Sequence, residues 1–262
     1  MKFHNRIQNL NTDINDIKLL PFCHTTDYHT YLNDIIVDYE GHIFKGNPIK
    51  YFEEKNVICF YYGKAKYYSK TDISTNYTSN PPVTLVFSEN ILDQTARVFP
   101  FDTGGFEFLK MHDSLANFQC EEKAQFKSFI LHFIKIFYDN NDNYLKNCRY
   151  CALKESDFID FFMRDMIKLY KADLSDTTSF DERAYTLEIH LDFNEVSLVP
   201  ETVILPDSYF TNEANITELK SRIPHEIKCE VYESCATELM KCHYNMQAKV
   251  REVITNRLKE IA

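Results

Sequence analysis

Glycine is scarce in this sequence and unevenly placed. Only 5 glycines occur among 262 residues, and all of them lie in the first 105. Glycine is the residue that most readily permits left-handed turns and close approach of the backbone to a ligand. The special turns are therefore expected in the first part of the chain, and much of the second half is expected to be helical.

Long hydrophobic runs are also missing. The apolar stretch from Ile130 to Tyr138 is interrupted by His132 and Lys135 and is far too short to cross a bilayer. The opening residues, MKFHNRIQNLNTDIND, have neither an apolar core nor a small-residue cleavage site, so no signal peptide is expected. These absences predict a cytoplasmic protein without membrane contact.

A net positive charge is the third absence. The formal net charge is −10, whereas a protein that binds nucleic acid through generic phosphate contacts needs a basic surface. The charge disfavours such a protein but leaves room for a local basic groove. With 44% hydrophobic and 26% charged residues, the composition is that of a globular protein.

Eight cysteines are present without a secretion signal, so free thiols are expected rather than a disulfide framework. Cys148 and Cys151 have the spacing of half a zinc site. The residues that could complete it have spacings that fit no compact ligand pair: Cys229, Cys235, Cys242 and His243. No metal site is therefore predicted.

The spacing of apolar residues predicts a mixture of strands and helices. Strands are expected at residues 19–26, 57–62, 83–88, 184–191, 202–205 and 227–232. Helices are expected at residues 31–37, 123–138, 155–170, 216–222 and 235–262. No repeat or low-complexity linker divides the chain. The prediction is a single elaborated α+β domain over residues 1–262, with a helical insertion over residues 106–175.

The strand predicted at residues 57–62 leads into a segment rich in tyrosine and lysine. The run is apolar on both parities, which is typical of a buried strand, and it ends at Gly63. Lys64, Lys66, Tyr67 and Tyr68 follow. Glycine allows a ligand close to the backbone and tyrosine rings offer flat apolar faces, so this segment is a candidate pocket floor. A core strand followed by an ordinary tyrosine-rich loop explains the same pattern.

The segment from Arg97 to Phe108, RVFPFDTGGFEF, predicts a tightly specified loop. Pro100 fixes a bend, Asp102 and Thr103 can form an Asx-type turn, and the pair Gly104–Gly105 permits positive φ. The segment lacks the lysine and the serine or threonine of a phosphate-binding P-loop. A functional loop and a structural corner both remain open.

Glu188 is the most unusual polar residue of the predicted strands. It lies at the centre of an alternating segment and shares one face with Thr186 and His190. A carboxylate in this position faces either solvent, on an edge strand, or a pocket.

The order of these segments resembles the ADP-ribosyltransferase fold. The likeness is to its His-Tyr-Glu branch and, within that branch, to DarT-type nucleic-acid ADP-ribosyltransferase toxins. It rests on three segments: His24-Thr25-Thr26 at the end of the first strand, Phe60-Tyr61-Tyr62-Gly63-Lys64, and Arg183-Ala184 leading to Leu187-Glu188-Ile189. The resemblance implies a split antiparallel sheet, NAD as the substrate, and a nucleic acid or a protein as the acceptor of ADP-ribose. For a toxin it also implies an antitoxin or other partner protein.

The resemblance further implies roles for individual residues. Glu188 would be the catalytic carboxylate, opposing the positive charge that develops on the ribose as the nicotinamide–ribose bond breaks. Tyr62 would stack on the nicotinamide, with Tyr61 or Tyr68 as substitutes. His24 would bind the adenosine ribose, and Lys64 the pyrophosphate. The implied NAD-binding residues are thus His24, Thr25, Thr26, Tyr61, Gly63, Lys64 and Tyr68.

The sequence departs in two places from the motifs of other ADP-ribosyltransferases, which limits the branches of the family that it resembles. The segment around Glu188 has no Gln/Glu-x-Glu motif, so transfer to arginine is unsupported. His24 is followed by threonine rather than glycine, which separates the chain from diphtheria-toxin-like members.

Two alternatives remain open. Pro206–Asp207 and Glu226-Ile227-Lys228 match the pattern of a PD-(D/E)xK nuclease, in which the acids bind Mg²⁺ and the lysine steadies the attacking water. The other alternative is a non-catalytic protein-binding module, in which the tyrosine-rich loop contacts a partner and Glu188 is dispensable.

Overall fold

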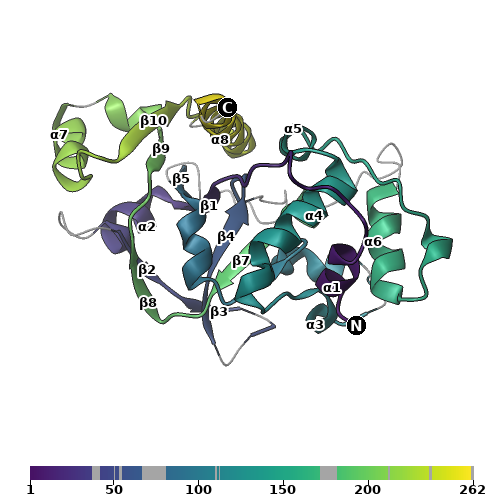
Figure 1. Cartoon of the computed structure of the whole chain (residues 1–262). Coiled ribbons are helices and arrows are strands. Elements are labelled where there is room, and N and C mark those ends of the chain that lie inside the picture. The colour runs from purple at the N-terminus through teal and green to yellow at the C-terminus, as the bar shows by residue number, and fades with distance from the viewer. Residues whose placement is uncertain are drawn as a thin grey trace. The chain divides into compact units, whose positions relative to one another are not determined.

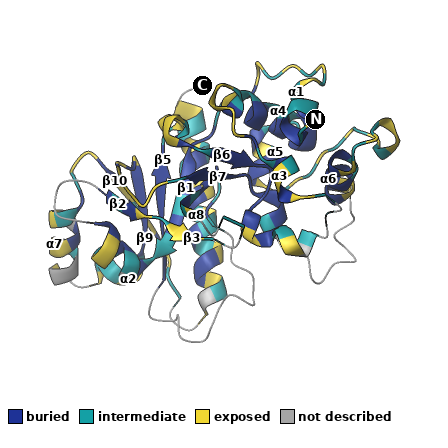
Figure 2. Cartoon of the chain, turned by 90° about the horizontal axis from the view of Figure 1, so that it is seen from below, coloured by how far each residue is buried: buried dark blue, intermediate teal, exposed yellow. Residues whose placement is uncertain are grey.

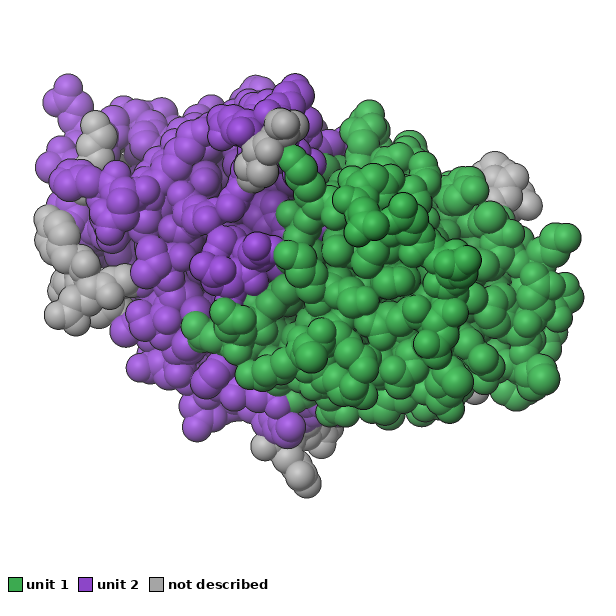
Figure 3. All heavy atoms as spheres, in the orientation of Figure 1, with its two compact units in different colours: residues 1–19, 92–190 green, residues 20–91, 191–262 purple. Residues whose placement is uncertain are grey.

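The computed structural model describes residues 1–36, 42–49, 51–52, 55–66, 81–109, 111, 113–171, 182–211, 213–235 and 238–260. The chain divides into two compact units, which Figure 3 shows in different colours. Unit 1 comprises Met1–Leu19 and Leu92–His190, and unit 2 comprises Leu20–Ile91 and Leu191–Ala262. Each unit is thus built from two separate stretches of chain. The segment 106–175, which the sequence predicts as a helical insertion, falls within unit 1.

Unit 1 is mostly helical (Figure 1). Its α-helices are α1 (Phe3–Gln8), α3 (Leu115–Phe118), α4 (Phe126–Tyr138), α5 (Asn141–Leu145) and α6 (Phe161–Lys171). Short 3₁₀ segments are η3 (Glu89–Gln94), η4 (Thr103–Leu109), η5 (Lys123–Gln125), η6 (Glu155–Asp157) and η8 (Glu182–Tyr185). The strands β6 (Arg97–Phe99) and β7 (Glu188–Leu191) pair antiparallel, with Phe99 opposite Glu188. This pairing places Glu188 next to the predicted loop that follows Phe99.

Aromatic rings form the core of unit 1. Phe3 of α1 lies at the centre, and its ring centroid is 5.7–6.3 Å from those of Phe118, Phe129, Phe133, Phe137 and Phe162. An isolated helix as short as α1 is unstable in water. Burial of a phenylalanine side chain contributes about 1.5–3 kcal/mol, so packing against α4 holds α1 in place.

Unit 2 is built on a sheet. Its strands are β1 (Phe22–Asp27), β2 (His42–Lys45), β3 (Asn47–Pro48), β4 (Asn56–Tyr62), β5 (Pro82–Phe87), β8 (Glu195–Leu198), β9 (Thr202–Pro206) and β10 (Lys228–Tyr232). Its helical elements are α2 (Tyr28–Thr30), the π-helical turn η1 (Tyr31–Ile35), η9 (Asp207–Phe210), α7 (Glu213–Arg222) and α8 (Leu239–Glu260). The strand order is β10-β9-β5-β1-β4, β3 adds to β4, and β2 and β8 form a separate antiparallel pair.

The strand β5 is central in this sheet. It pairs with β1 on one side and β9 on the other, and all six of its residues are buried, as Figure 2 shows by their dark blue colour. A strand enclosed on both faces is apolar on both parities, which is why the sequence predicts it well. The helix α8 contacts β5, β9 and β10 through one face that buries Met246, Val250 and Ile254.

The structure confirms the α+β class but broadens the predicted sheet. β1, β4, β5 and β9 are antiparallel neighbours, whereas β9 and β10 run parallel, so the sheet is mixed rather than purely antiparallel. Parallel neighbours need a crossover connection, and η9 and α7 supply it. Among the helices that the structure describes, none combines the length and the hydrophobicity needed to cross a bilayer.

Several predicted boundaries are wrong: the helix predicted at 235–262 begins at Leu239 and the strand predicted at 19–26 begins at Phe22. The helix predicted at 155–170 begins at Phe161, because Phe158 is extended, with φ −127° and ψ 137°. The strand predicted at 184–191 begins at Glu188, because the residues before it form the 3₁₀ turn η8. The sequence analysis also missed β2, β3, β6 and β8, which are four residues long or shorter.

Gly46, between β2 and β3, is expected to tolerate no side chain. Its N–H donates to the carbonyl of Asn194 at 2.9 Å, and a Cβ built on it would lie 2.1 Å from the carbonyl oxygen of Phe193. Backbone cannot move aside as a side chain can, so Gly46→Ala should lower the free energy of unfolding by about 3 kcal/mol. Chemical denaturation measures this loss. Gly104→Ala is the matched control, because the nearest atom there is a side-chain oxygen of Asp102 at 3.0 Å. Equal losses in both variants would contradict the prediction.

Candidate functional site

A cavity of about 540 Å³ lies within unit 2 where β1 ends, a volume typical of small-molecule sites. It is lined by residues of β1, α2, η1, β2 and β3 and by Lys66. Three of the predicted NAD-binding residues, His24, Thr25 and Thr26, are among them. The end of the first strand is thus the part of the predicted site that lies at a cavity.

His24 is half-buried and has a fixed tautomer. Its Nδ1 is 2.9 Å from the carbonyl oxygen of Cys59 on β4. A carbonyl can only accept, so Nδ1 carries the hydrogen, and in the neutral ring Nε2 is then an acceptor. Burial lowers the pKa of His24 to about 4, and the hydrogen bond to Cys59 opposes this only in part, while Lys66 lowers the pKa further. At neutral pH the cavity therefore contains an uncharged imidazole whose Nε2 can accept a hydrogen bond.

Aromatic rings hold His24 in position. Its ring centroid is 5.1 Å from that of Phe44 and 5.2 Å from that of Phe60. Phe44 itself lines the cavity and packs on Phe60 and Phe87 in the core of unit 2. These buried rings fix the orientation of the imidazole at the cavity.

Thr25 and Asp27 use their side chains to shape the backbone around the cavity. Thr25 Oγ1 lies 3.0 Å from Thr84 Oγ1 and accepts a hydrogen bond from the N–H of Lys66, also at 3.0 Å. Asp27 caps α2 by accepting from the N–H of Thr30 at 2.9 Å and from its hydroxyl at 2.7 Å. These contacts fix the lysine-bearing segment and the start of the helix against the end of β1.

Both signs of charge line the cavity. Lys45 and Lys66 provide the cations, and Asp27 and Asp34 the carboxylates. The sequence analysis assigned the pyrophosphate to Lys64, but among the described residues the lysines that line this cavity are Lys45 and Lys66. Lys45 was missed because β2 is only four residues long and its partner β8 lies far along the chain.

The predicted residues on and after β4 are placed differently. Tyr62 is fully buried, and its hydroxyl accepts a hydrogen bond from the N–H of Leu20 at 3.0 Å. Tyr61 is also buried, and Gly63 has a φ of 60°, which glycine adopts without strain. For Tyr62 to stack on nicotinamide, its ring would have to leave the core. Tyr68 lies outside the described residues.

Glu188 lies in unit 1 and is buried, with 1% of its surface exposed, so the solvent-facing interpretation is wrong. Its Oε2 accepts from the N–H of Thr103 at 2.6 Å and lies 3.2 Å from Nε2 of His190. Burial alone would raise the pKa of Glu188, but His190 and the hydrogen bonds from Thr103 outweigh it and hold the pKa below its usual value. The carboxylate is therefore ionised at neutral pH and fixed in orientation.

The loop after Phe99 partly follows its prediction. Asp102 Oδ1 accepts from the N–H of Gly104 at 2.8 Å, so the predicted Asx-type turn is present. The two glycines do not use the positive φ that they permit, because both lie in η4. Glycine is favoured at 105 because a Cβ there would lie 3.0 Å from Cβ of Arg183. The turn presents the N–H of Thr103 to Glu188, so two sequence signals meet in one buried cluster.

The expected convergence of Glu188 with His24 and Tyr62 joins residues of different units and remains a prediction. Comparisons with known protein families, curated proteins and solved structures find no match to this chain. The features that bear on function are the cavity of unit 2 and, in unit 1, the buried cluster of Glu188, Thr103 and His190.

The nuclease alternative finds no support in the strand register of unit 2. In the parallel pair, Lys228 lies opposite Thr202, whereas Tyr232 lies opposite Pro206, which precedes Asp207. At about 3.3 Å per residue, Asp207 and Lys228 are separated by roughly 16 Å along the strands. The lysine is therefore too far from the aspartate to steady a water on a Mg²⁺ ion that the aspartate binds.

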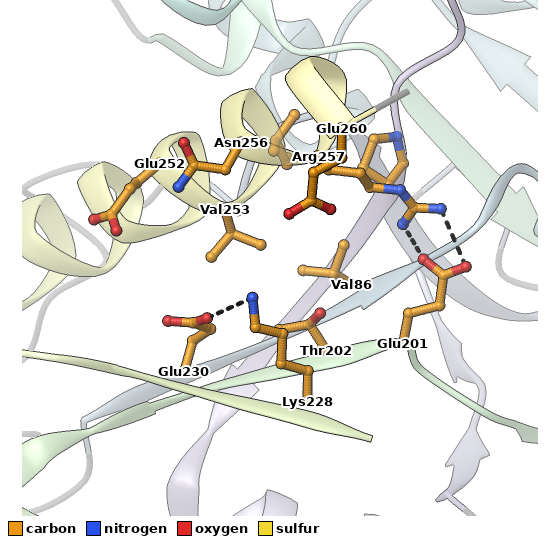
Figure 4. Close-up of a pocket in the computed structure, with 12 residues that line it drawn as sticks. Val86, Glu201, Thr202, Lys228, Glu230, Glu252, Val253, Asn256, Arg257 and Glu260 are labelled. Atoms are coloured by element: carbon orange, nitrogen blue, oxygen red, sulfur yellow. Dashed lines mark hydrogen bonds and ion pairs between the residues drawn. The ribbon is translucent and has the colours of Figure 1, made fainter. Parts of the chain in front are cut away.

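The same residues are engaged elsewhere. Asp207 accepts hydrogen bonds from the N–H and the hydroxyl of Ser234, at 2.8 and 2.5 Å. Lys228 lines a second cavity of about 200 Å³ between α8 and the neighbouring strands, where its Nζ is 2.9 Å from Glu230 (Figure 4). Arg257 is paired with Glu201 in that cavity. Because its cations are already paired with carboxylates, we assign no ligand to this second cavity.

Proposed function

We propose that the protein is an NAD-dependent ADP-ribosyltransferase and that the cavity at the end of β1 binds the adenosine side of NAD. The observation that carries the proposal is the neutral His24 in this cavity. Its Nε2 is an acceptor, and a ribose hydroxyl is the donor that it suits. Lys45 and Lys66 offer cations for the pyrophosphate.

Glu188 would supply the chemistry. As the nicotinamide–ribose bond breaks, positive charge grows on the ribose, and a fixed, ionised carboxylate stabilises that charge more in the transition state than in the ground state. The hydrogen bonds that keep Glu188 ionised meet this requirement. The acceptor of ADP-ribose would be a nucleic acid, a protein or water, and transfer to water would make the protein an NAD glycohydrolase.

Nicotinamide release from NAD tests the proposal. Glu188→Gln keeps the shape of the side chain but removes its charge, and the release rate should fall by about two to three orders of magnitude. His24→Gln should raise the KM for NAD by about tenfold, the equivalent of one hydrogen bond. His42→Gln is the matched control for the second variant. His42 is a buried histidine whose Nε2 contacts the hydroxyl of Tyr31, and it should leave the KM unchanged.

Each variant requires a melting curve, so that loss of folding is not mistaken for loss of function. No nicotinamide release by the folded wild-type protein, with any acceptor class supplied, would overturn the proposal and favour the protein-binding module. Equal activity of the wild type and Glu188→Gln would remove the carboxylate from the mechanism.

A further inference from the structure

Two cysteines of unit 2 meet at the start of α8. All eight cysteines carry free thiols. The N–H of Cys235 donates to Sγ of Cys242 at 3.4 Å, and this nitrogen is bonded to the Cα that carries the Cys235 side chain. A disulfide requires its two Cα atoms to lie about 4.4–6.8 Å apart, a separation compatible with this contact. We propose that Cys235 and Cys242 form an intramolecular disulfide when the protein is exposed to a peroxide.

The two thiols differ in exposure to solvent, and this difference indicates which of them reacts first with peroxide. Cys235 is half-buried, whereas Cys242 is buried, with 2% of its surface exposed. The Cys235 thiol loses its proton and its sulfur attacks the peroxide, the O–O bond breaks, and Cys235 becomes a sulfenic acid while the departing hydroxide takes up the thiol proton and leaves as one water. The Cys242 thiol then loses its proton as its sulfur attacks the Cys235 sulfur, the S–O bond breaks, and the departing hydroxide takes up that proton and leaves as a second water. In total the two thiols lose two electrons and two protons, which hydrogen peroxide takes up to form two waters.

The surroundings of Cys242 suit a resolving thiol. Burial raises the pKa of Cys242, so it stays protonated and unreactive toward solvent oxidants. The N–H of Cys235 and the position of Cys242 in the first turn of α8 stabilise negative charge as it develops on the sulfur. The hydroxyl of Tyr232 lies 3.9 Å from the same sulfur. Cys242 is therefore suited to react with an oxidised neighbour rather than directly with peroxide.

Peptide mapping of the full chain tests the proposal. The protein is treated with hydrogen peroxide, remaining thiols are alkylated, and trypsin then cleaves after Lys228, Lys241 and Lys249. Cys235 and Cys242 fall in separate peptides, 229–241 and 242–249, so a disulfide between them links the two. The linked pair should appear in the wild type with the mass of two hydrogen atoms lost, disappear on reduction, and be absent from Cys235→Ser.

Cys229 is the matched control, because it lies in the same tryptic peptide as Cys235 and is exposed on β10. Cys229→Ser should keep the linked pair. Loss of the link in this variant, or its survival in Cys235→Ser, would assign it to Cys229 and overturn the proposal. Alkylation of both thiols after peroxide treatment, or oxidation of Cys235 to the sulfonic acid without a link, would also overturn it.

Discussion

Replacing His190 with leucine is expected to lower the free energy of unfolding by about 3–5 kcal/mol. The imidazole is fully buried, and its Nε2 is 3.2 Å from the buried carboxylate of Glu188. Without it, the carboxylate keeps the N–H of Thr103 as a donor but loses the imidazole, and it stays buried. Leaving a buried carboxylate without one of its partners is more costly than replacing both partners. Urea denaturation at neutral pH measures the loss.

A second substitution distinguishes the effect of the Glu188 charge on stability from the effect of lost packing at His190. In the double variant Glu188→Gln/His190→Leu the uncompensated charge is gone, so the double variant should be more stable than His190→Leu alone. A double variant that is less stable than His190→Leu would show that the imidazole contributes by packing rather than by compensating the carboxylate.

Acidification is expected to destabilise the protein well above the pH at which carboxylates titrate. His24, His42 and His243 of unit 2 each have a pKa of about 4, against an ordinary value of 6.5, chiefly because burial disfavours their charged forms. The unfolded chain takes up these protons below about pH 6.5, whereas the folded protein does so only near about pH 4. Stability is therefore complete above the unfolded pKa and is lost as the pH falls toward the folded one.

The expected loss between about pH 7.5 and about pH 5 is about 2 kcal/mol for each histidine, and about 6 kcal/mol for the three. Free energies of unfolding measured across this pH range test the size and the sign of the expected change in stability. His24→Gln and His42→Gln should each remove about a third of the slope. His225→Gln should leave it unchanged, because His225 is exposed. Stability that rises on acidification would contradict the assignment of neutral buried rings.

Helices and strands that show a clear pattern within their own residues were predicted well from the sequence. β4 and β5 are apolar on both parities, and α4 repeats its apolar residues with helical spacing, so each is recognisable without its neighbours. The short strands β2 and β8 were missed because they are defined by pairing with each other, and more than 140 residues separate them. Pairing between strands so distant leaves little signal in either segment.

The residues of the candidate site likewise fall into those that a local pattern reveals and those that only the folded chain reveals. His24 was recognisable because it follows a clear apolar strand, and the structure places it at a cavity. Lys45 was not, because it belongs to β2. The hydrogen bond from Thr103 to Glu188 was not predictable either, since it depends on the register of β6 and β7. The resemblance implied that Tyr62 stacks on nicotinamide, but its place in the strand turns its ring into the core.

The division of each unit between two stretches of chain has a consequence for synthesis. The strand β5 reaches its partner β9 only after the whole intervening segment, including nearly all of unit 1, has been made. Contacts so distant along the chain slow folding, because loops must close before any pairing energy is gained. Until β9 (Thr202–Pro206) leaves the ribosome, one side of β5 has no partner strand, which exposes an apolar strand of the nascent chain to wrong pairing.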